Sequence, residues 1–371
     1  MDRASLKDCR RWVVKVGSAL LTDDGQGLNY DFVASLAKQI AFLRDQGIEV
    51  VLVSSGAVAA GVSQLGLTAR PERINELQAA AAVGQASLVR HYEDVFRPLE
   101  LTTAQVLLTH ADIANRERYL NARSTLLTLI GYGAVAIVNE NDTVANEEIC
   151  FGDNDSLGAL VANLVDAELL VILTDQNGLY TADPRSNSDA TLIETASADD
   201  QSLVAMASGG SSVGRGGMVT KLSAAQIASR SGAHTVIASG RELDVLGRVY
   251  QGEALGTLLK AKTRVASRKQ WVAGQMKVAG KFVLDSGAVQ VLQSAGRSLL
   301  PVGVTKISGE FTRGAFVQCV DDQGNEIARG LSNYSSSEVE KIKGKSSDAI
   351  FDILGYGGES ELIHRDNLVL V

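Results

Sequence analysis

The sequence predicts an α/β fold in which helices sandwich a mainly parallel sheet, followed by a small C-terminal β-barrel-like domain. From Trp12 to Gly240, short apolar runs alternate with segments of helical periodicity, which is typical of a parallel sheet with helices on its faces. Beyond the basic segment Lys260–Lys269, the pattern changes to short strand-like runs separated by Gly and Asp turns. The length of 371 residues also exceeds the usual size of one domain. We therefore expect a first domain over residues 8–260 and a second over residues 275–360.

Six apolar runs are the expected strands of the first domain. They are Trp12–Val16, Ile48–Val53, Ala104–Leu108, Ala134–Val138, Leu169–Leu173 and His234–Ala238. In open α/β sheets, ligands bind beyond the carboxyl ends of the strands. We therefore expect functional side chains just after these runs, and four polar residues hold such positions, namely Lys15, Ser55, Asp142 and Asp175.

Four segments between these strands have the periodicity of helices. Apolar residues recur at three- and four-residue spacing from Phe32 to Leu43, and Gly47 follows where a helix C-terminus is expected. The other expected helices are Glu72–Phe96, Ala114–Ile130 and Ser223–Ser231. Each lies between two predicted strands, as the connections of a parallel sheet require.

The second domain is predicted to be β-rich. Its expected strands are Lys281–Leu284, Val302–Ile307, Ala315–Val320 and Ile327–Leu331, and its expected short helices are Ser337–Ile342 and Ser347–Ile353. From Trp271 to the end, 10 Lys and Arg stand against 12 Asp and Glu. This near-neutral charge argues against RNA binding, because phosphate contacts need Lys and Arg.

Composition excludes several classes of protein. The net charge of −8 gives no overall basic face for nucleic acid. Three separated cysteines, Cys9, Cys150 and Cys319, argue against a disulfide framework and favour a reducing compartment. The N-terminus lacks the apolar core of a signal peptide, and no run reaches the roughly 18 apolar residues of a membrane span. We therefore expect a cytoplasmic protein with no membrane partner.

Two lysine-containing loops favour phosphate chemistry. Lys15 precedes the small-residue turn Gly17–Ala19, where backbone amides can approach phosphate oxygens while the ammonium neutralises their charge. Lys221 closes the glycine-rich loop that begins at Gly214, and a helix starting near it would direct its positive end at the loop. The alternatives are a lysine that extends from a strand end into solvent and a flexible surface turn.

Two loops rich in Asp and Asn favour recognition of a small zwitterion. They are Asn139–Asp142 and Asp153–Asp155, each next to an apolar run. An amino acid presents both an ammonium group and carboxylates, so its site needs the mixed donors and acceptors that Asn and Asp supply. Ser55 could simply belong to a tight strand-to-helix turn, and Asp175 could cap a helix, bind a nucleotide or help to hold Mg²⁺.

Three further patterns resemble functional motifs without meeting their requirements. Gly344–Ser346 imitates the end of a P-loop, but the required upstream glycine is Val339, so we expect a surface turn. Gly131–Gly133 imitates a dinucleotide turn but precedes a strand, whereas that motif must follow one. The four histidines are isolated in the sequence, so zinc or a His-based triad has little support, and the sequence leaves the metal ligands open.

Six motifs, taken in order, resemble the amino acid kinase family, and in particular its members that phosphorylate the side-chain carboxylate of L-glutamate in the first step of proline biosynthesis. The motifs are Val13–Ser18, Val53–Gly61, Val138–Val144, Phe151–Leu157, Leu173–Arg185 and Gly216–Leu222. The lysine and Thr-Asp elements are shared with other amino acid kinases, whereas the two Asp/Asn loops are more specific. The resemblance covers nearly the whole chain, because bacterial members often carry a C-terminal PUA domain.

The resemblance implies a role for each matching position. Lys15, Lys221 and Asp155 would be catalytic, with Asp155 orienting the two lysines and the lysines stabilising the phosphoryl group in transfer. Ser55, Asp142 and Asn154 would hold glutamate. The implied contacts to ATP, used with Mg²⁺, are Lys15, Thr174, Asp175, Arg215, Gly216, Gly217, Met218, Val219, Thr220 and Lys221. Arg215 departs from the family, which usually has Thr before the Gly-Gly-Met sequence.

The resemblance also implies partners that residue spacing does not reveal. They are further copies of the same chain, in a dimer or a tetramer, and proline as a feedback inhibitor. Three rival interpretations remain. The first is a kinase of aspartate, acetylglutamate, carbamate or a nucleotide, the second is an RNA-binding or RNA-modifying protein, and the third is an inactive regulator. The paired Asp/Asn loops count against the first, and the presence of both lysines with Asp155 counts against the last.

Overall fold

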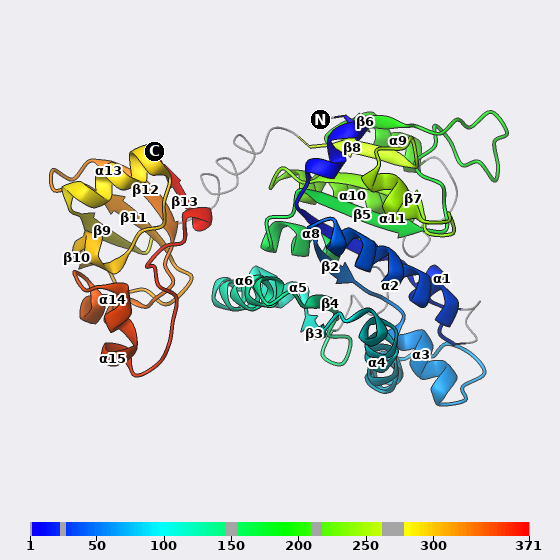
Figure 1. Ribbon diagram of the computed structural model, residues 1–371, viewed down its shortest axis with the longest axis horizontal. Coiled ribbons are helices and arrows are strands. Elements are labelled where there is room, and N and C mark those ends of the chain that lie inside the picture. The colour runs from blue at the N-terminus through cyan, green and yellow to red at the C-terminus, as the bar shows by residue number, and fades with distance from the viewer. Residues whose placement is uncertain (1, 23–26, 146–153, 209–216, 262–277, 371) are drawn as a thin grey trace. The chain divides into compact units, whose positions relative to one another are not determined.

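The computed structural model describes residues 2–22, 27–145, 154–208, 217–261 and 278–370. Contacts divide the chain into two compact units (Figure 1). The first comprises Met1–Ala111 and Arg123–Ser267, and the second comprises Asp112–Ala122 and Arg268–Val371. Most of the expected basic linker lies outside the described residues, although Lys260 belongs to a strand.

The larger sheet belongs to the first unit. Within the described ranges its order is β3-β4-β2-β1-β5-β7-β8-β6, and all its neighbouring strands are parallel except β7 and β8. The strands are β1 (Arg11–Val16), β2 (Glu49–Val53), β3 (Thr103–Leu108), β4 (Val135–Glu140), β5 (Leu169–Thr174), β6 (Thr195–Ser197), β7 (His234–Ser239) and β8 (Thr257–Lys260). All six predicted runs are strands, so the mainly parallel sheet is confirmed, while β6 and β8 were not predicted.

Helices precede or connect these strands, and the part of α5 and α6 within Asp112–Ala122 belongs to the second unit. They are η1 (Arg3–Asp8), α1 (Ser18–Leu21), α2 (Tyr30–Asp45), α3 (Ala57–Gln64), α4 (Ile74–Phe96), η2 (Arg97–Leu99), α5 (His110–Ala114), α6 (Arg116–Gly131), α8 (Asp155–Leu164), α9 (Gln201–Ser208), α10 (Met218–Ser229) and α11 (Val245–Tyr250). Local sequence sets their ends: the side chain of Asn29 accepts a hydrogen bond from the Phe32 amide of α2, and Gly47 adopts a positive φ of 80° after that helix.

Two helix boundaries differ from the prediction. The segment Ala114–Ile130 contains the end of α5 and most of α6, because the Asn115 side chain accepts from the Arg118 amide and caps a new helix. The helix predicted from Ser223 begins earlier, at Met218, where Gly217 is in an extended conformation at the N-cap. The Gly131–Gly133 segment connects α6 to β4, as expected for a helix-to-strand turn.

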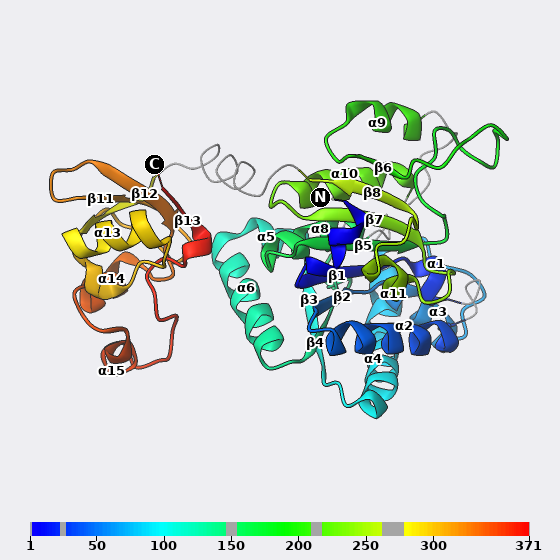
Figure 2. The same cartoon turned by 45° about the horizontal axis from the view of Figure 1, so that its top comes forward.

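The two faces of the larger sheet carry different layers of helices (Figure 2). Side chains alternate along a strand, so Trp12, Val14 and Val16 of β1 share one core with apolar residues of α2, α3, α4 and α11. The intervening residues point to the opposite face, where α8 and α10 contact β5. Lys15 is one of these intervening residues, and its direction therefore follows from the pleat.

The second unit contains a small sheet with strand order β10-β9-β11-β12-β13 and helices that cover its core. Its strands are β9 (Gly280–Leu284), β10 (Val304–Ser308), β11 (Phe316–Val320), β12 (Glu326–Leu331) and β13 (Leu368–Leu370). Its helices are α13 (Ser286–Ala295), η3 (Pro301–Gly303), α14 (Ser336–Ile342), η4 (Ser347–Ala349), α15 (Ile350–Leu354) and η5 (Arg365–Asn367). The four predicted strands are present, but the run predicted from Val302 starts as a 3-10 turn because Pro301 cannot donate to a ladder.

A membrane-spanning helix needs both sufficient length and apolar side chains, and none of the described helices combines the two. Cys9 and Cys319 are buried, whereas Cys150 lies outside the described residues. Gly344–Ser346 is exposed, as predicted for a surface turn.

Candidate active site

The carboxyl ends of β1, β2, β4 and β5 lie next to one another in the larger sheet. The prediction that Lys15 follows its strand is wrong. Lys15 lies within β1, in register with Val53 of β2 and Ile172 of β5, because the ladders with both neighbours continue through it. Ser55, Asp142 and Asp175 do follow their strands.

Asp155 is the centre of a buried ion-pair cluster with two lysines. Its Oδ1 lies 2.5 Å from Lys15 Nζ, and its Oδ2 lies 3.0 Å from Lys221 Nζ. The hydroxyl of Thr220 lies 3.1 Å from Oδ2 as well. Asp155 is completely buried, and the two lysines are 3% and 6% exposed. Three elements, β1, α8 and α10, thus bring two positive charges together around one carboxylate.

Electrostatics keep this carboxylate ionised. Burial alone raises the pKa of Asp155, but the ammonium groups of Lys15 and Lys221 outweigh burial and lower that pKa to about 2. The cluster therefore carries two positive charges and one negative charge in a dry environment. Its net positive charge suits an anion such as a phosphoryl group.

Asn154 and Ser54, the residue before Ser55, belong to a second cluster of polar groups. The Asn154 Nδ2 group donates to the Ser54 carbonyl at 2.6 Å and to Asn139 Oδ1 at 2.7 Å. Ser55 Oγ is buried and has no hydrogen-bond partner among the described residues. A buried hydroxyl without a partner costs free energy unless a ligand supplies one. Ser55 is therefore suited to contact a bound substrate.

Asp142 lies beside a second carboxylate. Burial raises the pKa of Asp142 to about 7, with a further contribution from Glu140 that outweighs the opposing effect of Arg70. Glu140 is itself buried, and its Oε1 lies 3.6 Å from Nδ1 of His110. Two neighbouring carboxylates in a partly dry environment form a good site for an ammonium group.

The predicted nucleotide contacts are only partly described. Thr174 ends β5 and is buried, and its hydroxyl lies 3.1 Å from Oδ1 of the exposed Asp175. Gly217, Met218, Val219 and Thr220 form the start of α10. Arg215 and Gly216 lie outside the described residues, as does the part of the Asp/Asn loop from Asn146 to Asp153.

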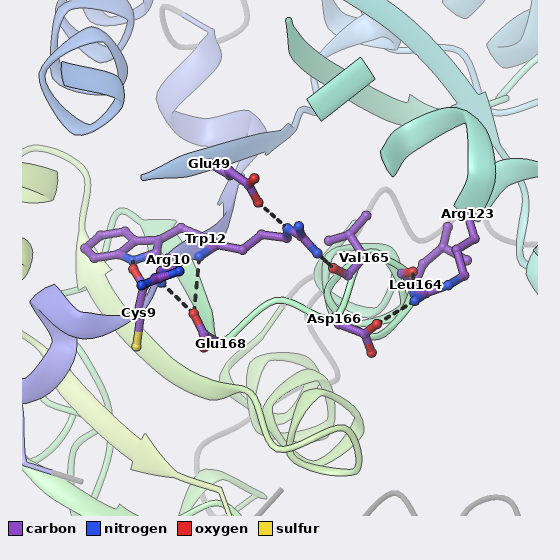
Figure 3. Close-up of polar contacts among 10 residues, drawn as sticks. Cys9, Arg10, Trp12, Glu49, Arg123, Leu164, Val165, Asp166 and Glu168 are labelled. Atoms are coloured by element: carbon purple, nitrogen blue, oxygen red, sulfur yellow. Dashed lines mark hydrogen bonds and ion pairs between the residues drawn. The ribbon is translucent and has the colours of Figure 1, made fainter. Parts of the chain in front are cut away.

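The opposite end of α8 is held by two arginines (Figure 3). Arg11 donates to the Val165 carbonyl, and Arg123 donates to the Leu164 carbonyl while its Nη2 lies 2.6 Å from Asp166 Oδ2. These groups satisfy carbonyls that a helix C-terminus leaves without partners, and positive charge there is favourable. The helix that carries Asp155 at its first position is therefore fixed at both ends.

Comparison with known proteins identifies the family. The model of the amino acid kinase family matches residues 10–239 of the chain, and that of the PUA domain matches residues 280–354. The chain belongs to the amino acid kinase family. The glutamate 5-kinase of Ralstonia nicotianae is 59% identical over 371 residues, which cover 100% of this chain and 99% of the relative. The glutamate 5-kinase of Burkholderia mallei is 60% identical over 371 residues, which cover 100% of both chains.

These whole-length identities place this amino acid kinase in the glutamate 5-kinase group. Among solved structures, UMP kinase from Bacillus anthracis is similar with a TM-score of 0.49 and 17% identity, covering 69% of this chain and 97% of that chain. The sequence prediction of the family, and of a separate PUA domain, is confirmed.

Sequence reasoning missed several polar residues that support the site of this amino acid kinase. Asn139 and Glu140 belong to a motif that resembles the family, but their contacts come from residues far away in the chain. Gln85 Oε1 accepts a hydrogen bond from Asn139 Nδ2 at 2.7 Å, and the Tyr92 hydroxyl lies 2.9 Å from Ser54 Oγ. Both Gln85 and Tyr92 lie within a helical pattern, and nothing in their spacing indicates a polar role.

Proposed function

We propose that this amino acid kinase transfers the γ-phosphoryl group of ATP to the side-chain carboxylate of L-glutamate, forming L-glutamyl 5-phosphate and ADP in the first step of proline biosynthesis. The observation that carries the proposal is the buried Asp155 between two lysines, beside a polar cluster suited to an amino acid. The similar proteins of R. nicotianae and B. mallei are glutamate 5-kinases, which supports the choice of substrate.

The nucleophile in this reaction needs no general base. A glutamate side chain has a reference pKa of about 4.3 and is already ionised at neutral pH. Phosphoryl transfer depends mainly on positioning and on neutralising charge over the phosphate oxygens. Lys15 and Lys221 supply that charge, and Asp155 holds their ammonium groups in place.

We assign the two substrates, glutamate and ATP, to different loops. Ser55, Asn154 and Asp142 bind the amino acid, and Asp142 provides a carboxylate for its ammonium group. Thr174, Asp175 and the segment from Arg215 to Lys221 contact ATP, with the start of α10 directed at the phosphates. The side-chain carboxylate of glutamate would then face the γ-phosphate next to the two lysines.

Magnesium fits this site as an ion that accompanies the nucleotide. Among the described residues, no group of three or more His, Cys, Asp or Glu side chains is arranged to hold a metal. Both carboxylate oxygens of Asp155 are engaged by ammonium groups, whereas Asp175 is exposed at the end of β5. Mg²⁺ commonly binds through substrate phosphates and one or two carboxylates, and it would neutralise phosphate charge here. Asp175 is the residue we assign to it.

We further propose a modular protein that works in the cytoplasm. Residues 8–260 would perform the chemistry, and residues 275–360 would modify it. Each described residue assigned to ATP, glutamate or phosphoryl transfer lies in the first unit. A homo-oligomer and inhibition by proline belong to the same proposal.

A chain ending near Lys262 should keep kinase activity. A folded truncation that binds both substrates without turnover would contradict the proposal that the first domain performs the chemistry alone.

A substrate screen tests the proposed activity. The purified protein is incubated with ATP, Mg²⁺ and hydroxylamine, which converts an acyl phosphate into a hydroxamate that forms a coloured complex with added iron(III). L-Glutamate should give hydroxamate, and aspartate and N-acetylglutamate should give little. Turnover of either alternative without turnover of glutamate would overturn the assignment.

A further inference from the structure

The amide of Asn154 has its orientation set by a backbone group. Its Nδ2 donates to the Ser54 carbonyl at 2.6 Å. A carbonyl can only accept hydrogen bonds, so the half of the Asn154 amide that meets it must be the NH₂ group. The second hydrogen of Nδ2 is directed to Asn139 Oδ1 at 2.7 Å. Both donors of the amide are therefore used inside the protein.

A second backbone group fixes the orientation of Asn139. The amide of Glu140 donates to Asn139 Oδ1 at 3.0 Å, and a backbone N–H can only donate. Asn139 must therefore present its oxygen to Glu140 and Asn154, which leaves its Nδ2 to donate to Gln85 Oε1 at 2.7 Å. The remaining polar atom of Asn154 is Oδ1, an acceptor that receives no hydrogen bond from a described residue.

Helix α4 supports both of the residues that hydrogen-bond to Asn154. Gln85 and Tyr92 are seven residues apart on α4, so they lie on one face, about 10 Å apart along the axis. Gln85 holds Asn139, and the fully buried Tyr92 holds Ser54 through a 2.9 Å contact between hydroxyls. Asn139 and Ser54 are the two groups that engage Asn154.

Close packing fixes α4 against α3. A Cβ atom added at Gly61 would lie 1.7 Å from the Ala80 carbonyl oxygen, and one added at Gly84 would lie 1.9 Å from that of Ala57. The two helices are in backbone contact and cannot slide without a clash. Since α3 begins two residues after Ser55, α4 is held at a constant distance from the site.

We propose that Gln85 and Tyr92 are positioning residues that keep Asn154 Oδ1 facing the substrate as an acceptor for its ammonium group. The inference rests on the proposed phosphorylation of glutamate. If the Asn154 amide turned over, its NH₂ group would face the ammonium and the hydrogen bond would be lost. The carboxylates of Asp142 and Glu140 nearby offer the same acceptor chemistry, so the whole cluster favours a cationic group.

Substitution of Gln85 separates positioning from general stability. Gln85→Met removes the acceptor for Asn139, whereas Gln85→Glu keeps one. We expect Gln85→Met to raise the KM for glutamate about tenfold, with kcat and the KM for ATP changed less than about twofold, since one partly buried hydrogen bond is lost. Gln85→Glu should restore the KM to within about threefold of the unaltered enzyme. Tyr92→Phe should raise the same KM about threefold.

Glutarate provides the decisive control, because it has both carboxylates of glutamate but no ammonium group. Its inhibition constant should stay the same in Gln85→Met if the variant loses only recognition of the ammonium. Ser87→Ala is the matched control on α4, since it removes the contact between Ser87 and Gln64 away from the site and should leave every constant unchanged.

Two results would overturn the inference: a glutamate KM unchanged in Gln85→Met, or a glutarate constant that rises by the same factor as the glutamate KM. A glutamate KM that stayed raised in Gln85→Glu would count against it as well. Failure of the proposed function is a different outcome, because the unaltered protein would then form no hydroxamate from glutamate.

Discussion

Replacing Gly158 by Ala should slow phosphoryl transfer without weakening the fold. Gly158 lies in the first turn of α8, three residues after Asp155, and faces Lys15 on β1. A Cβ atom added at Gly158 would lie 3.2 Å from Lys15 Cβ and 3.3 Å from Lys15 Cγ. The new methyl group therefore pushes directly on the stem of a proposed catalytic lysine.

The size of the effect follows from these distances. Carbon atoms in contact prefer a separation of about 3.5–4.0 Å, so Lys15 or α8 must move by about half an ångström. A misplacement of about 1 Å can cost about 100-fold in rate, so we expect kcat to fall about tenfold. The same change replaces a glycine inside a helix, which by itself favours folding by up to about 1 kcal/mol. We therefore expect kcat to fall in Gly158→Ala without a matching fall in the free energy of unfolding.

Two measurements on the same variant check this expectation. The rate of hydroxamate formation at saturating ATP and glutamate gives kcat, and urea unfolding gives the free energy of unfolding. Gly131→Ala is the control, because a Cβ atom there meets nothing within 4 Å. An unchanged kcat in Gly158→Ala would show that α8 does not set the position of Lys15. A fall in kcat matched by a large loss of stability would show general damage instead.

Three further predictions address other parts of the site. Lys221→Ala should lower kcat by about 100- to 1000-fold with little change in the glutamate KM, because the Lys221 ammonium acts on charge that develops in the transition state. An unchanged kcat would remove Lys221 from the mechanism. Because burial and Glu140 raise the pKa of Asp142 to about 7, and the ionised form binds the ammonium, kcat/KM for glutamate should rise with pH to about 7 and then level off. Asp142→Asn should lower kcat/KM and abolish this dependence, and a profile that keeps its shape would assign it to another group. Arg123→Ala should lower the free energy of unfolding by about 3 kcal/mol in urea titrations, because it removes a buried guanidinium that donates to the Leu164 carbonyl and pairs with Asp166. A change below about 1 kcal/mol would show that these contacts contribute little.

The strands of the larger sheet were predictable because parallel strands are buried on both faces. Such strands appear as continuous apolar runs, and β4 and β5 are buried along their whole length. The three-residue strand β6, with no buried residue, gives no comparable signal. Helix α13 was missed because Gly287 and the β-branched Val289 and Val291 weaken its helical pattern, whereas the structure caps it with the Asp285 side chain.

The candidate site was predictable only where residue type carries the chemistry. Lysines next to glycines and paired Asn and Asp residues indicate phosphate and amino acid binding, and the structure brings Lys15, Asp155 and Lys221 together. The direction of Lys15 depends on the strand pleat and on the absence of a side chain at Gly158, which no local pattern reveals. The roles of Gln85 and Tyr92 depend on contacts with residues 54 and 38 positions away, respectively.

The origin of the bridging oxygen tests the central claim that the glutamate side chain is the nucleophile. L-Glutamate labelled with ¹⁸O in both side-chain carboxylate oxygens is phosphorylated in the presence of hydroxylamine. Attack of the carboxylate on the γ-phosphorus makes a labelled oxygen the bridge, and hydroxylamine then attacks the acyl carbon and expels phosphate with that oxygen. Mass spectrometry of the released phosphate should show one ¹⁸O per phosphate. Phosphate without ¹⁸O would mean that another acceptor received the phosphoryl group, and would contradict the proposed reaction.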